Sequence, residues 1–152
     1  MCSVEVVRYN GNMTNTKHRQ GTVSELLAAS YFVQKGCIVS SPIDRHGEYD
    51  LVVDDGRKMR RIQVKTIYWD RSKNRFLISC VTSHIRGNGR RTNKKYSDNS
   101  IDTLVGVEHE SGAIYEIPYE KISGRRSITV YPKEKPETVN KRYQDYEGYR
   151  MR

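Results

Sequence analysis

Three polar residues stand at a spacing that suits metal-assisted chemistry. Asp50 opens an apolar run over residues 51–53, and Gln63 and Lys65 alternate with apolar residues in the next such run. The carboxylate of Asp50 is a hard oxygen ligand for Mg²⁺, and the side-chain oxygen of Gln63 or the backbone carbonyl of Val64 can complete the coordination shell. Lys65 can then orient or deprotonate an attacking water, so the set is suited to cleaving a phosphodiester bond.

The charge of the chain is concentrated around these residues. The 152 residues carry a formal net charge of +9, from 27 Lys and Arg against 18 Asp and Glu. Between Arg57 and Lys95 there are thirteen basic residues and one acid, Asp70, so this segment carries +12 and the rest of the chain −3. A local basic patch beside a candidate metal site predicts a polyanionic partner.

The basic residues form two kinds of candidate DNA contact. The one-signed runs at 57–61 and 71–75 predict contacts to phosphates. From 83 to 100 the sequence has no period, and its Arg and Asn side chains can read guanine and adenine edges. A β-ribbon from strands around 58–82 could also lie in the major groove. The candidate DNA-binding residues are Arg57, Arg60, Arg61, Arg71, Lys73, Arg75, His84, Arg86, Asn88, Arg90, Arg91, Asn93, Lys94 and Lys95.

The elements that carry these residues predict an α+β fold, because a helix precedes an antiparallel meander. Apolar residues at three-to-four spacing predict a helix over 22–35, with an earlier start at Lys17 left open and a stop at Gly36. Alternation and turn residues predict strands over 37–41, 49–53, 58–69 and 76–82. A hairpin of 101–107 with 113–117 and a last strand over 127–131 follow.

The turn between the second and third strands decides whether Asp50 shares a face with Gln63 and Lys65. A two-residue loop, Asp55 and Gly56, pairs Asp50 with Arg61, and a four-residue loop puts Asp50 on the same face. A three-residue loop turns Asp50 to the other face unless a bulge restores it. We therefore expect an even loop or a bulge.

Asp50 with Gln63-Val64-Lys65 resembles the signature of the PD-(D/E)-x-K nucleases, and Glu25 stands at the position of their helix acid. A wider set of segments resembles the homing endonucleases of this superfamily that cyanobacterial group I introns encode. This likeness covers residues 17–131. The segments are 21–25, Gly36, Pro42, 49–53, 62–66, 101–102 and 115–118.

The resemblance implies a restriction-endonuclease-like core, in which a mixed sheet with an antiparallel meander is flanked by helices. It also implies a site-specific double-strand DNA endonuclease that uses Mg²⁺ or Mn²⁺ and works as a homotetramer. The implied catalytic residues are Glu25, Asp50, Gln63 and Lys65, and the implied metal ligands are Asp50, Gln63 and the Val64 carbonyl.

The sequence departs from the superfamily pattern at two positions. Gln63 stands where Asp or Glu is usual, and Tyr49 takes the place of the proline before Asp50. A neutral ligand weakens metal affinity, but the homing endonucleases named above carry Gln at this position, so we interpret Gln63 as a functional variant. Glu25 also has a structural interpretation, since residues 22–25 fit a capping box in which Glu25 bonds the backbone of Thr22.

The length and the 36% hydrophobic content support one domain. We expect an N-terminal arm over 1–16, a nuclease domain over 17–131 with its DNA-binding loop at 83–100, and a polar C-terminal extension over 132–152. The three cysteines predict neither a disulfide framework nor a zinc site. No apolar run reaches the ~18 residues of a membrane span, and the N-terminus lacks a signal peptide, so a cytoplasmic location is expected.

Two other functions compete with the homing endonuclease. A Holliday-junction resolvase of the same superfamily would share the active site but bind by DNA shape, whereas the Arg- and Asn-rich loop favours base readout. The third hypothesis is a non-catalytic nucleic-acid-binding domain with a decayed site. Because one active site cuts one strand and a duplex has two, the endonuclease hypothesis predicts a homo-oligomer.

Overall fold

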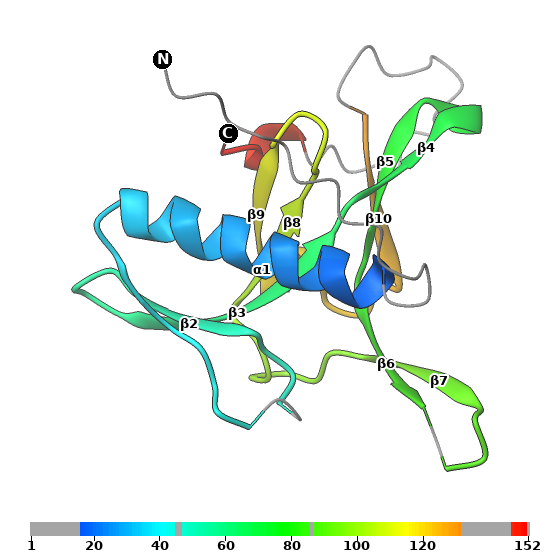
Figure 1. Ribbon diagram of the computed structural model, residues 1–152, viewed down its shortest axis with the longest axis horizontal. Coiled ribbons are helices and arrows are strands. Elements are labelled where there is room, and N and C mark those ends of the chain that lie inside the picture. The colour runs from blue at the N-terminus through cyan, green and yellow to red at the C-terminus, as the bar shows by residue number, and fades with distance from the viewer. Residues whose placement is uncertain (1–15, 45–46, 86, 132–146, 152) are drawn as a thin grey trace, which may run out of the picture.

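A long helix lies across one face of a mixed five-stranded sheet (Figure 1). The computed structural model of the chain describes residues 16–44, 47–85, 87–131 and 147–151. The helix is α1 (Thr16–Gln34), and the sheet is ordered β1 (Ile38–Ser40), β2 (Leu51–Asp54), β3 (Met59–Thr66), β8 (Thr103–Val107) and β9 (Ile114–Pro118). β3 and β8 run parallel and the other neighbours antiparallel, which confirms the predicted mixed α+β architecture.

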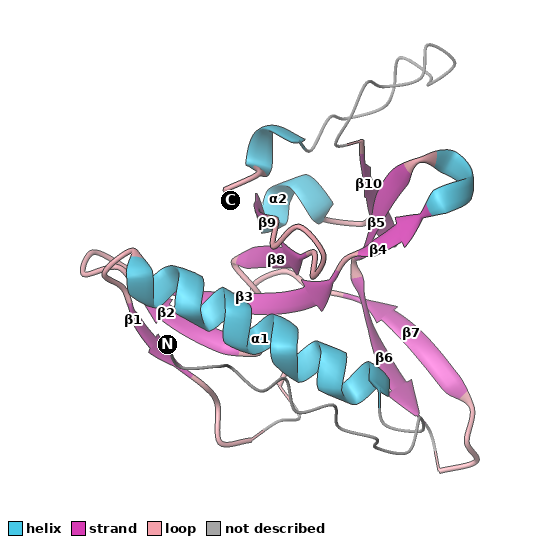
Figure 2. Cartoon of the chain, turned by 45° about the horizontal axis from the view of Figure 1, so that its top comes forward, coloured by secondary structure: helices cyan, strands magenta, loops and turns pink. Residues whose placement is uncertain are grey.

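Two smaller strand groups complete the fold. A three-stranded sheet is ordered β10 (Ser127–Val130), β5 (Arg75–Ser79) and β4 (Tyr68–Asp70). β6 (Val81–Ile85) and β7 (Arg91–Lys95) form a hairpin that projects from the body near the N-terminal end of α1 (Figure 2). The remaining elements are short: η2 (Arg71–Lys73), α2 (Tyr119–Ile122) and η3 (Glu147–Tyr149).

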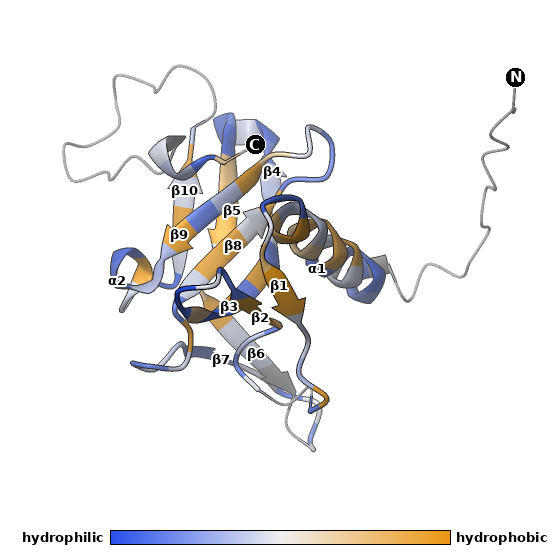
Figure 3. Ribbon diagram, turned by 90° about the vertical axis from the view of Figure 1, so that its left-hand side faces the viewer, coloured by the Kyte–Doolittle hydropathy of each residue, from blue (hydrophilic) through white to orange (hydrophobic). Residues whose placement is uncertain are grey.

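The five-stranded sheet has a hydrophobic layer on each face. On one face, Phe32 and Ala28 of α1 pack against Val53, Ile62 and Val105 of the sheet. On the other face, side chains of β8 and β9 pack against the three-stranded sheet, and orange segments mark hydrophobic residues along β5, β8 and β9 (Figure 3). Burial of these apolar surfaces drives the two layers together.

The turn between β2 and β3 confirms the even loop. Leu51 pairs with Ile62 and Asp54 with Met59, so four residues, 55–58, form the loop. The carboxylate of Asp55 accepts the N–H groups of the third and fourth loop residues at 2.9 and 3.0 Å, and Gly56 takes a positive φ of 81°. Of the two even loops, the two-residue loop is wrong and the four-residue loop is present. One residue beyond the pair of Leu51 with Ile62, Asp50 therefore lies opposite Gln63 and not opposite Arg61.

The helix begins earlier than the core prediction of 22–35, at Thr16, and this start excludes the capping box. Thr22 lies inside α1, where its hydroxyl donates to the carbonyl of His18 at 3.2 Å. An N-cap must sit at the helix start, so Thr22 cannot be one. The stop is as predicted: Gly36 has a φ of 81° and its N–H bonds the Val33 carbonyl at 2.9 Å.

Two strands predicted as continuous are each divided between two sheets. The run 58–69 breaks after Thr66: Thr66 is the last residue of β3 that pairs with β8, the Ile67 side chain is buried between the sheets, and Tyr68 already pairs with Leu77 of β5. The run 76–82 breaks at Cys80, between β5 and β6. The predicted meander ends at β3, because β4 and β5 belong to another sheet. The stretch 83–100 is not structureless, since it contains most of the β6–β7 hairpin.

The expected arm and extension fall mostly outside the described residues, at 1–15 and 132–146. Thr16 already belongs to α1. Near the other end, the Met151 N–H donates to the Ile114 carbonyl at 2.7 Å, so the last described residues lie against β9. Neither described helix is long and apolar enough to cross a membrane.

Candidate active site

The side chains of Asp50, Gln63 and Lys65 lie on the face of the sheet opposite α1. Asp50 directly precedes β2, and its N–H donates to the Ile62 carbonyl at 2.8 Å, which extends the ladder by one residue. Its carboxylate accepts the Val64 N–H at 2.8 Å and the side-chain amide of Gln63. The shared face predicted from the sequence is therefore present.

The Gln63 amide lies between two oxygens that were predicted to bind metal. Its side chain is 8% exposed, and its NH₂ group donates both to Asp50 Oδ2 and, at 3.2 Å, to the Val64 carbonyl. A cation placed between Asp50 and Val64 would therefore replace this NH₂ group. Gln63 would offer its oxygen to the cation only after the amide turned by half a rotation.

The charges of this site are poorly solvated. Burial raises the pKa of Asp50 to about 6, and the negative charge of Glu25 adds to the rise, while hydrogen bonding and the Lys65 ammonium oppose it. Burial also lowers the pKa of Lys65, against the attraction of Asp50. A buried, ionised carboxylate is poorly solvated, so an approaching cation stabilises it strongly. This is the property that a metal ligand needs.

A cleft of about 820 Å³ opens over this face and unites all four predicted catalytic residues: Glu25, Asp50, Gln63 and Lys65. The N-terminal half of α1 forms one wall, and the start of β6 forms another. A smaller cavity of about 230 Å³ joins Glu25 and Asp50 from the other side. Glu25 thus reaches the site from the helix, as its position in the motif implies.

The donors of the cleft fit a hard divalent cation. They are the carboxylates of Asp50 and Glu25, the Val64 carbonyl and, after rotation, the Gln63 oxygen. Within the described ranges, no three His, Cys, Asp or Glu side chains gather to hold a metal ion. This oxygen-rich set suits Mg²⁺ or Mn²⁺ and does not suit the nitrogen and sulfur ligands that zinc prefers.

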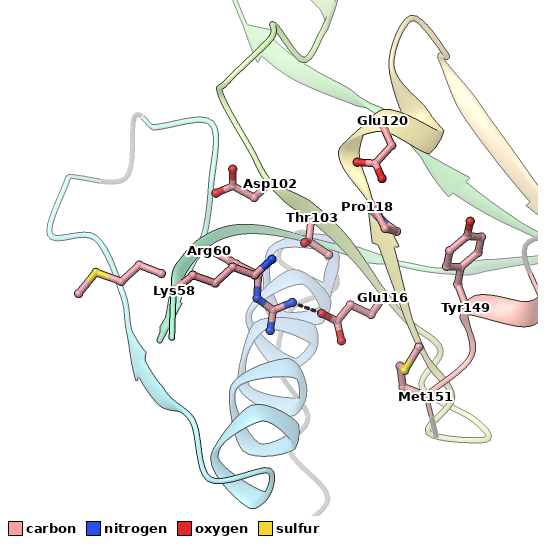
Figure 4. Close-up of a pocket in the computed structure, with 10 residues that line it drawn as sticks. Lys58, Arg60, Asp102, Thr103, Glu116, Pro118, Glu120, Tyr149 and Met151 are labelled. Atoms are coloured by element: carbon pink, nitrogen blue, oxygen red, sulfur yellow. Dashed lines mark hydrogen bonds and ion pairs between the residues drawn. The ribbon is translucent and has the colours of Figure 1, made fainter. Parts of the chain in front are cut away.

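Three of the predicted phosphate contacts form ion pairs within the chain. Arg60 pairs with Glu116 on the α1 face of the sheet, beside a cavity of about 470 Å³ (Figure 4). Arg61 holds Asp102 through its backbone N–H at 2.7 Å and through its guanidinium. Arg75 bonds the acid Asp70 at 3.1 Å. The charges of these three arginines are thus partly neutralised by acids of the chain itself.

The hairpin carries most of the other predicted contacts. Asn88, Arg90 and Lys95 are exposed there, while Lys94 bonds Glu48 at 3.3 Å. Asn93 accepts the Ser83 hydroxyl across the hairpin at 2.9 Å. Arg57, Arg71 and Lys73 are exposed at other turns. Arg86 is outside the described residues, and only the backbone is described at His84 and Arg91.

The structure brings two further groups to the site that no sequence pattern indicated. Tyr96 lies against Lys65, with 5.8 Å between the ammonium and the ring centroid. Ser24, directly before Glu25, bonds both Thr66 and His109 at 2.8 Å and so ties α1 to the end of β3. These residues lie far apart along the chain, and neither group has a spacing that marks it.

An α+β core with an acid and a Gln-x-Lys pair on one face of a mixed sheet defines a PD-(D/E)XK-type nuclease. Residues 14–152 match the model of the PD-(D/E)XK endonuclease family, and the chain belongs to that family. Its fold is restriction-endonuclease-like. Members of this family generally use divalent metal ions.

Two known proteins resemble the chain over most of its length. Protein 5.3 of Escherichia phage T7 is 28% identical over 116 residues, which cover 76% of this chain and 92% of that protein. The structure of a bacterial homing endonuclease, I-Ssp6803I, matches with a TM-score of 0.73 at 20% identity. The match covers 89% of this chain and 88% of that one, and it shows a shared fold.

Proposed function

We propose that this nuclease is a site-specific, Mg²⁺-dependent homing endonuclease that cuts both strands of DNA. The observation that carries the proposal is the meeting of Glu25, Asp50, Gln63 and Lys65 in one cleft, beside a projecting basic hairpin. A group I intron as the source of the gene and a cytoplasmic location belong to the same proposal. The likeness to a homing endonuclease fold supports it.

Each catalytic residue has a distinct role in this proposal. Asp50 and the Val64 carbonyl would hold the cation, with Mn²⁺ as a substitute for Mg²⁺, and Gln63 would ligate or orient it if its amide turned. Lys65 orients the attacking water or takes its proton, and Glu25 acts from α1 on the same cation. A bound Mg²⁺ would offset the charge that develops on the scissile phosphate.

The exposed basic residues around the cleft are proposed to hold the DNA. We propose that Asn88, Arg90 and Lys95, which are exposed on the hairpin, contact bases or phosphates. We also assign the nuclease domain to residues 17–131. The exposed hairpin favours base readout, and thereby the homing endonuclease over the junction resolvase.

Cleavage of both strands requires at least two copies of the chain, and we propose a homotetramer. An apolar groove lies beside the cleft, between α1 and β1, and it includes Glu25 at its edge. Leu26 and Val33 expose 65% and 59% of their surfaces there. A second copy docked on this groove would bury these apolar side chains and bring two clefts near each other.

The test is cleavage of a plasmid library with long random inserts, in Mg²⁺, by the wild type and by Lys65→Ala and Asp50→Ala. We expect the wild type to linearise a small subset that shares one sequence, and each variant to lose at least about a hundredfold in rate. Lys35→Ala, just beyond the C-terminal end of α1, is the matched control and should cut normally. Retained cleavage by either folded active-site variant contradicts the assignment.

The same assay separates the competing functions. Cleavage of synthetic four-way junctions at equal rates whatever their sequence would identify a resolvase. No cleavage of any DNA in Mg²⁺ or Mn²⁺ would leave a non-catalytic nucleic-acid-binding domain.

A further inference from the structure

Tyr96 joins the base of the hairpin to the lysine of the active site. It directly follows β7, is 6% exposed, and packs in the hydrophobic layer between the sheets. The Lys65 ammonium lies over its ring, 5.8 Å from the centroid. That distance is within the range in which a cation is attracted to the face of an aromatic ring.

Both residues that flank the hairpin are anchored in the body and lie near Lys65. Val81 pairs with Lys95, so Cys80 and Tyr96 are the residues just beyond this pair. The Cys80 N–H donates to the Arg126 carbonyl at 2.9 Å, and the Tyr96 carbonyl accepts the Tyr119 hydroxyl at 3.3 Å. The base of the hairpin is therefore fixed beside the catalytic lysine.

The ring offers Lys65 an alternative to the Asp50 carboxylate. Lys65 and Asp50 attract each other and share a face, yet these two described residues form no ion pair within 4 Å. A direct pair would occupy the carboxylate that the cation needs. The ammonium lies instead over the Tyr96 ring, so Lys65 does not occupy the Asp50 carboxylate, which accepts hydrogen bonds from Val64 and Gln63.

The hydroxyl of Tyr96 does not explain its position. Among the residues the structure describes, this buried oxygen has no hydrogen-bond partner. A buried hydroxyl without a partner costs free energy, so the ring rather than the hydroxyl accounts for what Tyr96 contributes here.

We propose that Tyr96 is a positioning residue whose ring holds the Lys65 ammonium over the cleft and so makes the base of the DNA-reading hairpin part of the active site. The proposal rests on the function proposed above. It predicts that an aromatic ring at residue 96 is required for fast cleavage, whereas the hydroxyl is not.

The first test observes the contact without any activity. In protein with ¹³C-labelled lysine, the ε-CH₂ signal of Lys65 is assigned by its loss in Lys65→Arg. We expect a ring-current upfield shift of this signal in the wild type and in Tyr96→Phe, and its loss in Tyr96→Leu. An unshifted signal in the wild type, or a shift that survives in Tyr96→Leu, overturns the proposal.

The second test separates catalysis from binding, using the plasmid sequence that the wild type cuts. In Mg²⁺, Tyr96→Leu should lose about tenfold or more in single-turnover rate, while its Kd for the same DNA in Ca²⁺ stays within about twofold. Tyr96→Phe should restore the rate. Phe76 is another aromatic residue of the same hydrophobic layer. Phe76→Leu is therefore the control for a loosened core, and it should cut at the wild-type rate.

Equal loss of rate in Tyr96→Phe and Tyr96→Leu would overturn the proposal, because the hydroxyl would then be the active group. Equal loss in Phe76→Leu would reduce Tyr96 to a packing residue. If the wild type cuts no DNA, the proposed function fails, and the lysine signal alone then decides whether the ring holds Lys65.

Discussion

The amide of Gln63 joins the two oxygens that we propose as metal ligands. It donates to both Asp50 and the Val64 carbonyl, so it satisfies two oxygens that a metal would otherwise take. The acid that the family pattern places at this position would face the Asp50 carboxylate at hydrogen-bonding distance, and two carboxylates so close repel each other. The neutral residue thus reduces repulsion in the metal-free protein at the expense of ligand charge.

The raised pKa of Asp50 predicts that its ionisation destabilises the metal-free fold. Its pKa is about 6 in the folded chain and 3.8 when exposed, so between these values the folded state binds more protons. The free energy of unfolding should therefore fall as the pH rises through this window, with the full penalty present above it. In EDTA at about pH 8, Asp50→Asn should be more stable than the wild type by on the order of 1–3 kcal/mol.

Urea unfolding at a series of pH values measures this difference, which should disappear below the window. Asp55→Asn is the control of opposite sign, because hydrogen bonds from the backbone lower the pKa of Asp55 and its ionised form is favoured by folding. Asp55→Asn should therefore be less stable than the wild type at the same pH. An Asp50→Asn variant that is less stable at pH 8 would contradict a strained carboxylate.

Helix α1 is held to the sheet by a polar contact close to the candidate active site. Ser24 is 1% exposed, and its hydroxyl bonds Thr66 at the end of β3 and His109 after β8. Because Glu25 follows Ser24 and Lys65 precedes Thr66, this contact fixes the helix acid relative to the lysine. A polar bond buried between two elements has a defined geometry that apolar packing alone does not give.

The locally encoded elements were predicted from the sequence, and the non-local ones were not. Alternation and turn residues predicted β2, the β8–β9 hairpin and β10, and turn parity predicted the face of Asp50. The run 58–69 alternates without interruption, so only the change of partner, from β8 at Thr66 to β5 at Tyr68, shows the break between β3 and β4. Tyr96 lies in a segment without periodicity, and its contact with Lys65 depends on the whole fold.

The close approach of the two sheets at Gly106 predicts a strong effect of one methyl group. A Cβ there would lie 2.9 Å from the terminal methyl carbons of both Ile67 and Ile78, which are buried. Gly106→Ala should therefore lower the free energy of unfolding by about 1–3 kcal/mol through overpacking. Urea denaturation measures the loss.

Gly21 provides the matched control for this substitution. It lies in α1, and a Cβ there meets nothing within 4 Å. Gly21→Ala should raise the stability by about 0.5–1 kcal/mol, because alanine loses less backbone entropy in a helix. If the two variants behave alike, the two sheets are not as tightly packed at Gly106 as the distances indicate.

At the scale of the molecule, the excess charge divides into internal and external parts. Within the +12 segment, Arg60, Arg61 and Arg75 are held by acids of the chain, so they add little to an external field. The hairpin presents exposed basic side chains next to the cleft. The +12 segment therefore overstates the charge that faces outward, and the exposed cations are divided between the hairpin and the turns at 57–58 and 71–73.

This distribution predicts how DNA binding responds to salt. Each phosphate that a cation neutralises contributes about 0.9 to the slope of log K against log salt. Arg90→Ala combined with Lys95→Ala should therefore reduce the magnitude of the slope by about 1.8 for DNA of any sequence. Fluorescence anisotropy of a labelled duplex in EDTA, over a series of salt concentrations, measures it. Lys35→Ala, just beyond the end of α1 that is far from the cleft, should leave the slope unchanged. An unchanged slope in the double variant would exclude the hairpin as the DNA-binding surface.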